Sequence, residues 1–65
     1  MISIVIPCYN EEEVLPQLFA RLGAAAETWG EEYEILLVDD GSRDATWQLI
    51  LEQHARDERW RGISF

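Results

Sequence analysis

Two kinds of hydrophobic pattern alternate along the chain. Mostly apolar runs over residues 2–6 and 33–38, each with one polar residue near its start, are typical of strands that are apolar on both faces. Each run is followed by a stretch in which apolar residues recur at every third or fourth position, which predicts an amphipathic helix. We therefore expect helices over residues 12–28 and 43–57, and a third strand over residues 61–65.

Polar residues and turn formers mark the start of each expected helix. Asn10 offers a side chain that can cap the first helix, and the carboxylates that follow it favour a helix N-terminus. Pro16 is compatible with this helix only near its first turn. Before the second helix, the turn at residues 40–42 ends in Ser42, whose hydroxyl offers a cap of the same kind.

The order of the elements, β-α-β-α-β, predicts an α/β fold with three parallel strands and two helices, the Rossmann-like half of a doubly wound sheet. Two consecutive crossovers of one hand place both helices on the same sheet face. The other face would be bare, although the first two strands are apolar on both sides. We therefore expect residues 1–65 to be one fragment of a larger domain, which self-associates or pairs with the missing half.

Composition narrows the range of functions. The chain has 65 residues with five arginines, no lysine, 13 acidic residues and a formal net charge of -8. The absence of lysine excludes a Walker-type phosphate loop and a Schiff-base enzyme, and the acidic excess argues against nucleic acid as a partner. The single cysteine, Cys8, excludes an internal disulfide, and no apolar run is long enough to cross a bilayer. These features predict a cytoplasmic localisation.

Candidate chemistry follows the first two strands. Ligands of doubly wound sheets bind beyond the carboxyl ends of the strands, which directs attention to residues 7–11 and 38–42. Tyr9 offers an aromatic face and Glu11 a carboxylate, while Asp39 and Asp40 form an acidic pair beside a glycine turn. Aromatic stacking with an acceptor for a base N–H could hold a nucleobase. Carboxylates cannot hold phosphates without a cation, so a nucleotide ligand would imply a divalent metal.

Each of these residues also has a purely structural interpretation. Asp39 and Asp40 could end a strand and shape an Asx-type turn, and Tyr9 could be a core aromatic residue. Cys8 is most simply an inert, part-buried thiol, and His54 lies on the apolar stripe of the second helix. The glutamates after Glu11 are typical of a solvated helix start. The three tryptophans are most simply packing residues, at positions 29, 47 and 60.

Two segments, residues 4–12 (IVIPCYNEE) and 33–44 (YEILLVDDGSRD), resemble the amino-terminal part of family 2 glycosyltransferases. The greatest similarity is to the branch that makes polyprenyl-phosphate sugars, namely the dolichol-phosphate mannosyltransferases and undecaprenyl-phosphate sugar transferases. The resemblance implies a GT-A fold in which a UDP- or GDP-sugar lies across the ends of the first strands. By the same resemblance, a base and ribose pocket is lined by Pro7, Tyr9 and Glu11 and closed by Val38 and Asp40, with Asp39 as a supporting carboxylate.

The resemblance also implies an inverting transfer of the sugar to a polyprenyl phosphate or glycan acceptor, in cell wall or glycolipid biosynthesis. In the family, Mg2+ or Mn2+ is held by a later Asp-x-Asp motif, which this chain lacks. We therefore expect no catalytic residue and no metal ligand among these residues, and no transferase activity from the chain alone. A parent enzyme of this kind could associate with the cytoplasmic face of a membrane.

Two other classes of function are also compatible with the sequence. A half-domain with a bare sheet face could be a non-catalytic interaction module. The segment 36–40 also resembles the acidic strand end of response-regulator receivers, but their acidic pair follows the first strand, and here it follows the second.

Overall fold

The computed structural model describes residues 1–65 and has the expected order of elements. The strands are β1 (Ile2–Cys8), β2 (Tyr33–Asp39) and β3 (Trp60–Ser64), and the helices are α1 (Leu15–Ala26) and α2 (Thr46–Arg56). All three strands are parallel, in the spatial order β1-β2-β3. The predicted α/β, Rossmann-like half-sheet is therefore confirmed.

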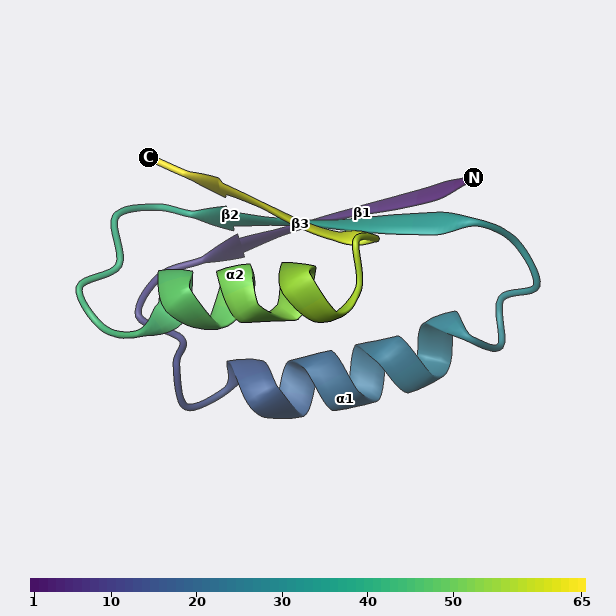
Figure 1. Ribbon diagram of the computed structural model, residues 1–65, viewed down its shortest axis with the longest axis horizontal. Coiled ribbons are helices and arrows are strands. Elements are labelled where there is room, and N and C mark those ends of the chain that lie inside the picture. Colours follow the sequence, from purple (N-terminus) through teal and green to yellow (C-terminus); the bar gives the residue numbers. More distant parts are fainter.

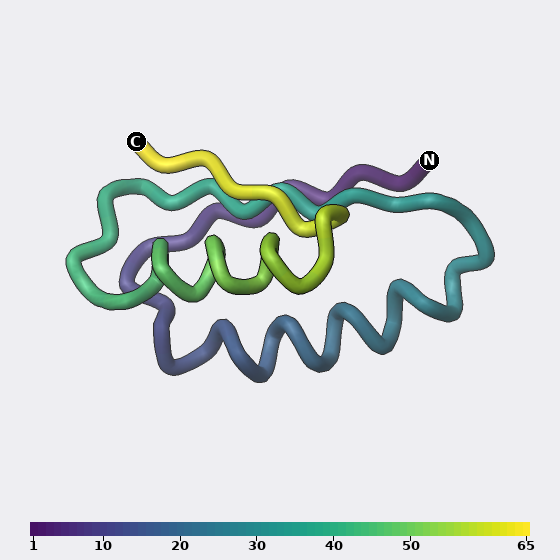
Figure 2. The backbone as a smooth tube through the Cα atoms, viewed as in Figure 1, coloured from purple at the N-terminus to yellow at the C-terminus, as the bar shows by residue number.

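Both helices lie on one face of the sheet, and the three strand arrows point toward the same end of the molecule (Figure 1). The loops that leave β1 and β2 meet at that end, where the backbone tube turns back beneath the sheet (Figure 2). This is the arrangement that two successive crossovers of one hand produce. Neither helix combines the length and the apolar character that a membrane span requires.

The core lies between the sheet and the two helices. In β2 every second residue is buried, because alternate side chains of a strand point to opposite faces. The ring of Phe19 on α1 meets that of Trp60 on β3 edge-on, with centroids 5.2 Å apart. The buried apolar residues are Cys8, Leu15, Ala26, Tyr33, Ile35, Leu37, Ile50 and Trp60.

The opposite face of the sheet carries apolar side chains that no helix covers. Val5 is 63% exposed and Ile63 is 44% exposed, and Leu36, which pairs with Val5, is half-buried. The expectation of a bare apolar face is therefore confirmed.

The helices are shorter than their hydrophobic periodicity predicts. Helix α1 begins at Leu15 rather than at residue 12, and residues 12–14 form a turn before it, in which the amide of Val14 donates to the carbonyl oxygen of Glu11 three residues earlier. Helix α2 begins at Thr46 rather than at residue 43. Pro16 lies in the first turn of α1, as expected. The third strand begins at Trp60, one residue earlier than predicted.

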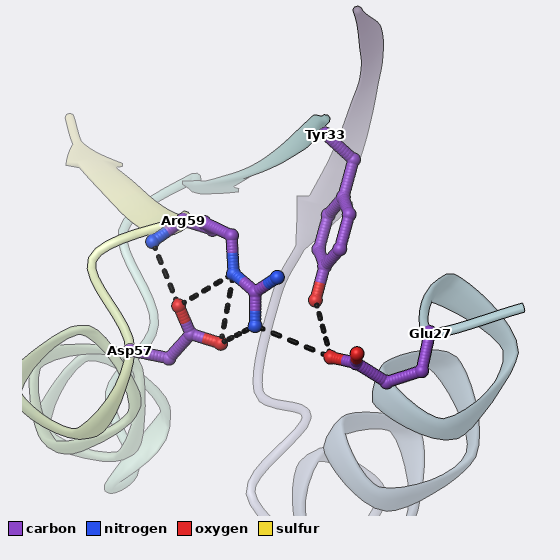
Figure 3. Close-up of polar contacts among 4 residues, drawn as sticks. All are labelled: Glu27, Tyr33, Asp57 and Arg59. Atoms are coloured by element: carbon purple, nitrogen blue, oxygen red, sulfur yellow. Dashed lines mark hydrogen bonds and ion pairs between the residues drawn. The ribbon is translucent and has the colours of Figure 1, made fainter. Parts of the chain in front are cut away.

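A polar cluster closes the amino-terminal edge of the sheet (Figure 3). The guanidinium of Arg59 lies 4.4 Å from the centroid of the Tyr33 ring and donates to Asp57 at 2.8 Å and to Glu27 at 3.3 Å. The hydrogen bonds from Arg59 lower the pKa of Asp57, and burial raises the pKa of Tyr33. This cluster joins the end of α1 to the start of β2 and to the turn between α2 and β3.

Candidate functional site

The two segments that the sequence singled out lie side by side at the carboxyl edge of the sheet. Cys8, the last residue of β1, pairs with Asp39, the last residue of β2. The amide of Asp40 then donates to the carbonyl oxygen of Cys8 at 3.0 Å. Tyr9 and Asp40 therefore leave the sheet from neighbouring positions.

Hydrogen bonds join the β1–α1 loop to the β2–α2 loop. Three successive amides of the first loop donate to side-chain oxygens of the second loop and of Thr46, the first residue of α2, and one amide of the second loop donates back. The bonds are Asn10 N to Ser42 Oγ (2.8 Å), Glu11 N to Thr46 Oγ1 (2.8 Å), Glu12 N to Asp44 Oδ2 (3.3 Å) and Arg43 N to Asn10 Oδ1 (2.8 Å). The amides of residues 10–12 are therefore already used and are not free to bind a phosphate.

Asn10 and Ser42 do not cap the helices, and this part of the prediction was wrong. The residues at the N-cap positions are Val14 and Ala45, and neither makes a side-chain capping bond. Asn10 instead adopts a left-handed conformation, with φ of 50°, which asparagine tolerates better than most residues. From there its side chain reaches the opposite loop rather than its own helix.

Asp39 and Asp40 are neighbours in sequence but differ sharply in environment. Asp39 is 2% exposed, and its Oδ1 accepts the amide of Ser42 at 3.1 Å as well as the Ser42 hydroxyl. It forms an Asx-type turn, which Gly41 helps to close with a φ of 74°. Asp40 lies one residue beyond the strand and is exposed. Only Asp40 is therefore available to a ligand.

The other predicted site residues surround this edge. Tyr9 is 55% exposed and is not a core residue, so its ring is accessible to a ligand. Glu11 is half-buried, and Pro7 and Val38 pair with each other one position before the strands end. A small pocket of about 180 Å³ lies beside the start of α1, and Pro7 and Glu11 line it. It is smaller than the roughly 300–1,000 Å³ of typical ligand pockets.

The surroundings of Cys8 and His54 indicate structural roles for both residues. Cys8 is 3% exposed, and its pKa is raised by burial and by the carboxylates of Glu11 and Asp39. Its thiol therefore stays protonated at neutral pH and is a poor nucleophile. His54 Nδ1 lies 2.7 Å from the carbonyl oxygen of Trp60, which ties α2 to the start of β3.

The side chains of this chain do not form a site for Mg2+ or Mn2+. No three His, Cys, Asp or Glu side chains lie close enough together to bind a metal ion. Asp39 is also unsuited to this role, because its Oδ1 already accepts two hydrogen bonds from Ser42. The residues of the chain therefore do not fit the metal by themselves.

The sequence features of these loops agree with comparisons to known proteins. The pattern of glycosyl transferase family 2 matches residues 3–65. The chain belongs to this family. A curated relative, the undecaprenyl-phosphate 4-deoxy-4-formamido-L-arabinose transferase of Pseudomonas fluorescens (strain SBW25), is 55% identical over 56 residues. That alignment covers 86% of this chain but only 16% of the length of the relative.

Two residues that hold the loops of the site together were not among the predicted site residues. Thr46 is fully buried at the start of α2. The carboxylate of Asp44 accepts hydrogen bonds from both the amide and the hydroxyl of Thr46. Hydrophobic periodicity gives no signal for a buried polar residue whose partner is 35 residues away. The only local indication was the Asp-x-Thr spacing, in which an aspartate can accept the amide two residues on.

Proposed function

We propose that this chain is the nucleotide-recognition part of a family 2 glycosyltransferase that transfers a sugar from a UDP- or GDP-sugar to a polyprenyl phosphate. The observation that carries the proposal is the pair of joined loops in a family 2 chain, which present Tyr9, Glu11 and Asp40 at one edge of the sheet. The relative's name supports a polyprenyl-phosphate acceptor, since it specifies undecaprenyl phosphate. Cell wall or glycolipid synthesis at the cytoplasmic face of a membrane is the corresponding setting.

The exposed side chains suit the nucleoside. The Tyr9 ring stacks on the base, and the Asp40 carboxylate accepts a hydrogen bond from a base N–H. The Glu11 carboxylate, in the loop before α1, accepts hydrogen bonds from the ribose hydroxyls. Pro7 and Val38 form the apolar floor where the two strands end, and the buried Asp39 keeps the turn that presents Asp40.

The diphosphate requires groups other than those in the two loops. The amides of residues 10–12 are occupied, and the carboxylates of this edge repel phosphate. A divalent cation such as Mg2+ or Mn2+ supplies positive charge for the departing nucleoside diphosphate in chemistry of this kind, and this chain does not form its site. The residues described here therefore contribute recognition of the nucleoside and not the displacement at the anomeric carbon.

The proposal is tested by an amide-resolved NMR titration of the chain with UDP and with GDP, each with and without Mg2+. We expect shifts at Tyr9, Glu11 and Asp40, and a dissociation constant about fivefold to tenfold higher in Asp40→Asn, because the asparagine keeps an acceptor oxygen but loses the charge, and a hydrogen bond to a charged group contributes about 1 kcal/mol more than a neutral one. Glu52→Gln, an exposed change on α2, is the matched control and should bind like the wild type. A well-folded chain without shifts at millimolar nucleotide would contradict the proposal.

A companion assay addresses the chemistry. The purified 65-residue chain should not transfer sugar from UDP- or GDP-sugars to undecaprenyl phosphate, because it lacks the Asp-x-Asp motif expected from the family resemblance. Product formation above that of a heat-denatured control would refute the division of roles proposed here.

The non-catalytic alternative is favoured by one observation, the exposed apolar side chains of Val5 and Ile63 on the bare sheet face. An interaction module would bind a partner through that face and would show no nucleotide-dependent shifts at the carboxyl edge. The same titration therefore separates the two functions. Membership of family 2 replaces the receiver-like interpretation.

A further inference from the structure

Thr46 is a polar residue in a buried position, and it is not among the residues proposed to contact the nucleotide. It is fully buried at the first residue of α2. Its Oγ1 accepts the amide of Glu11 at 2.8 Å, and the same hydroxyl contacts Asp44 Oδ1 at 2.5 Å. The Thr46 amide also donates to Asp44 Oδ1, at 2.9 Å. Glu11 of the first loop, Asp44 of the second loop and Thr46 itself are thus linked through one hydroxyl group.

The direction of these hydrogen bonds follows from the chemistry of the groups. A carboxylate can only accept, so the Thr46 hydroxyl proton points to Asp44 and a hydroxyl lone pair faces the Glu11 amide. Asp44 remains ionised at neutral pH, because hydrogen bonding from Thr46 lowers its pKa. The hydroxyl is therefore held in the one orientation that accepts from Glu11.

The Thr46 bond differs from the other contacts between the loops. The bonds of Asn10 with Ser42 and with Arg43 are exposed, and so is the 3.3 Å bond from Glu12 to Asp44. Water can replace any of these partners. The bond between Thr46 and Glu11 is part-buried, so loss of the hydroxyl would leave the Glu11 amide without an acceptor.

We propose that Thr46, oriented by Asp44, is a positioning residue that fixes the backbone at Glu11 and thereby the nucleotide-facing side chains of the β1–α1 loop. Tyr9 and Glu11 flank the left-handed turn at Asn10, so a change at the Glu11 amide alters how both side chains face Asp40. The binding consequence rests on the proposed nucleotide-recognition function. The effect on the loop itself does not.

The test compares Thr46→Val, which removes the hydroxyl at nearly constant shape, with Thr46→Ser, which retains it. Thr28→Val is the matched control, because Thr28 is exposed near the end of α1 and its hydroxyl bonds only the carbonyl of Ala25. For each variant we would measure amide dispersion, hydrogen exchange at Glu11 and the dissociation constant for UDP and GDP. In Thr46→Val, the Glu11 amide should exchange about tenfold faster and the dissociation constant should be about tenfold higher. In Thr46→Ser, both quantities should lie within about threefold of the wild type. Thr28→Val should change neither quantity.

The alternative outcomes are distinct. Wild-type exchange and affinity in a folded Thr46→Val would overturn the proposal, and so would a folded Thr46→Ser no better than Thr46→Val, since the methyl group would then be the important part. If Thr46→Val does not fold, the wild-type chain decides, because the proposal requires stronger protection at Glu11 than at Asn10 or Glu12. If the wild type binds neither nucleotide, the proposed function fails, and Glu11 exchange in the two variants still decides whether Thr46 fixes the loop.

Discussion

The contact between β3 and α2 leaves no room for a side chain at Gly62. A Cβ atom added there would lie 2.5 Å from Ile50 Cγ2 and 3.0 Å from Trp47 Cζ3. Ile50 is 1% exposed and cannot swing into solvent, so Gly62→Ala forces α2 away from the sheet. Overpacking of this kind costs about 1–3 kcal/mol of the free energy of unfolding. The change matters to the site because α2 carries Thr46 at its start.

Gly23 provides a control of the opposite sign. It lies inside α1, and a Cβ atom there would meet Trp60 Cζ2 at 3.8 Å, an ordinary van der Waals distance. Gly23→Ala should therefore stabilise the chain by about 0.5–1 kcal/mol, the usual gain from replacing a helix-interior glycine. The two glycine-to-alanine variants should thus differ by about 1.5–4 kcal/mol.

Equilibrium urea unfolding followed by far-UV circular dichroism measures both variants against the wild type. Because about 1 kcal/mol shifts the melting temperature of a domain this small by roughly 4–8 °C, thermal melts provide an independent check. Equal stability of Gly62→Ala and the wild type would refute the close packing of β3 on α2. A loss of stability in Gly23→Ala would show that α1 does not lie against Trp60 in this way.

Two further predictions concern charge and association. The pKa of Asp57 is lowered by its bonds to Arg59, so the stabilising effect of this pair is present above about pH 4 and is lost as the pH falls below it. Between pH 5 and pH 3, the free energy of unfolding in urea should therefore fall less for Arg59→Gln than for the wild type. Equal decreases would contradict the assignment. The exposed apolar side chains of Val5 and Ile63 predict self-association, which salt should strengthen because it screens the repulsion between chains of net charge -8. Sedimentation equilibrium should detect the association, and Ile63→Lys should reduce it. A monomer at high concentration in high salt would refute the prediction.

The strands and their order could be predicted because they depend on local pattern and general topology. Mostly apolar runs indicated β1 and β2, and both strands begin where the runs begin. The position of both helices on one face followed from successive crossovers of one hand. These features need no knowledge of which side chains meet across the fold.

The starts of the helices could not be predicted, because they depend on contacts between distant residues. Asn10 and Ser42 are residue types that often cap helices, yet each forms a hydrogen bond with a residue about 32 positions away. The acidic residues 12 and 13 were expected to begin the helix, but with Val14 they form a turn before it, and the amides of Val14 and Leu15 share the carbonyl of Glu11. Local propensity identified polar groups that would bond the backbone but not which backbone they would bond.

The acidic pair shows how one strand can assign opposite roles to identical side chains. Asp39 continues the alternation of β2, so its carboxylate points to the buried face and is used by Ser42. Asp40 follows the last strand residue and is exposed. The structural interpretation therefore applies to Asp39, whereas Asp40 is the residue of the pair that we propose to contact the nucleoside. The same division extends to the first loop, where the backbone of Glu11 is bound by Thr46 while its carboxylate remains available to a ligand. In the function proposed here, this acidic edge recognises the donor groups of a nucleoside while the bonds between the two loops hold its backbone in place.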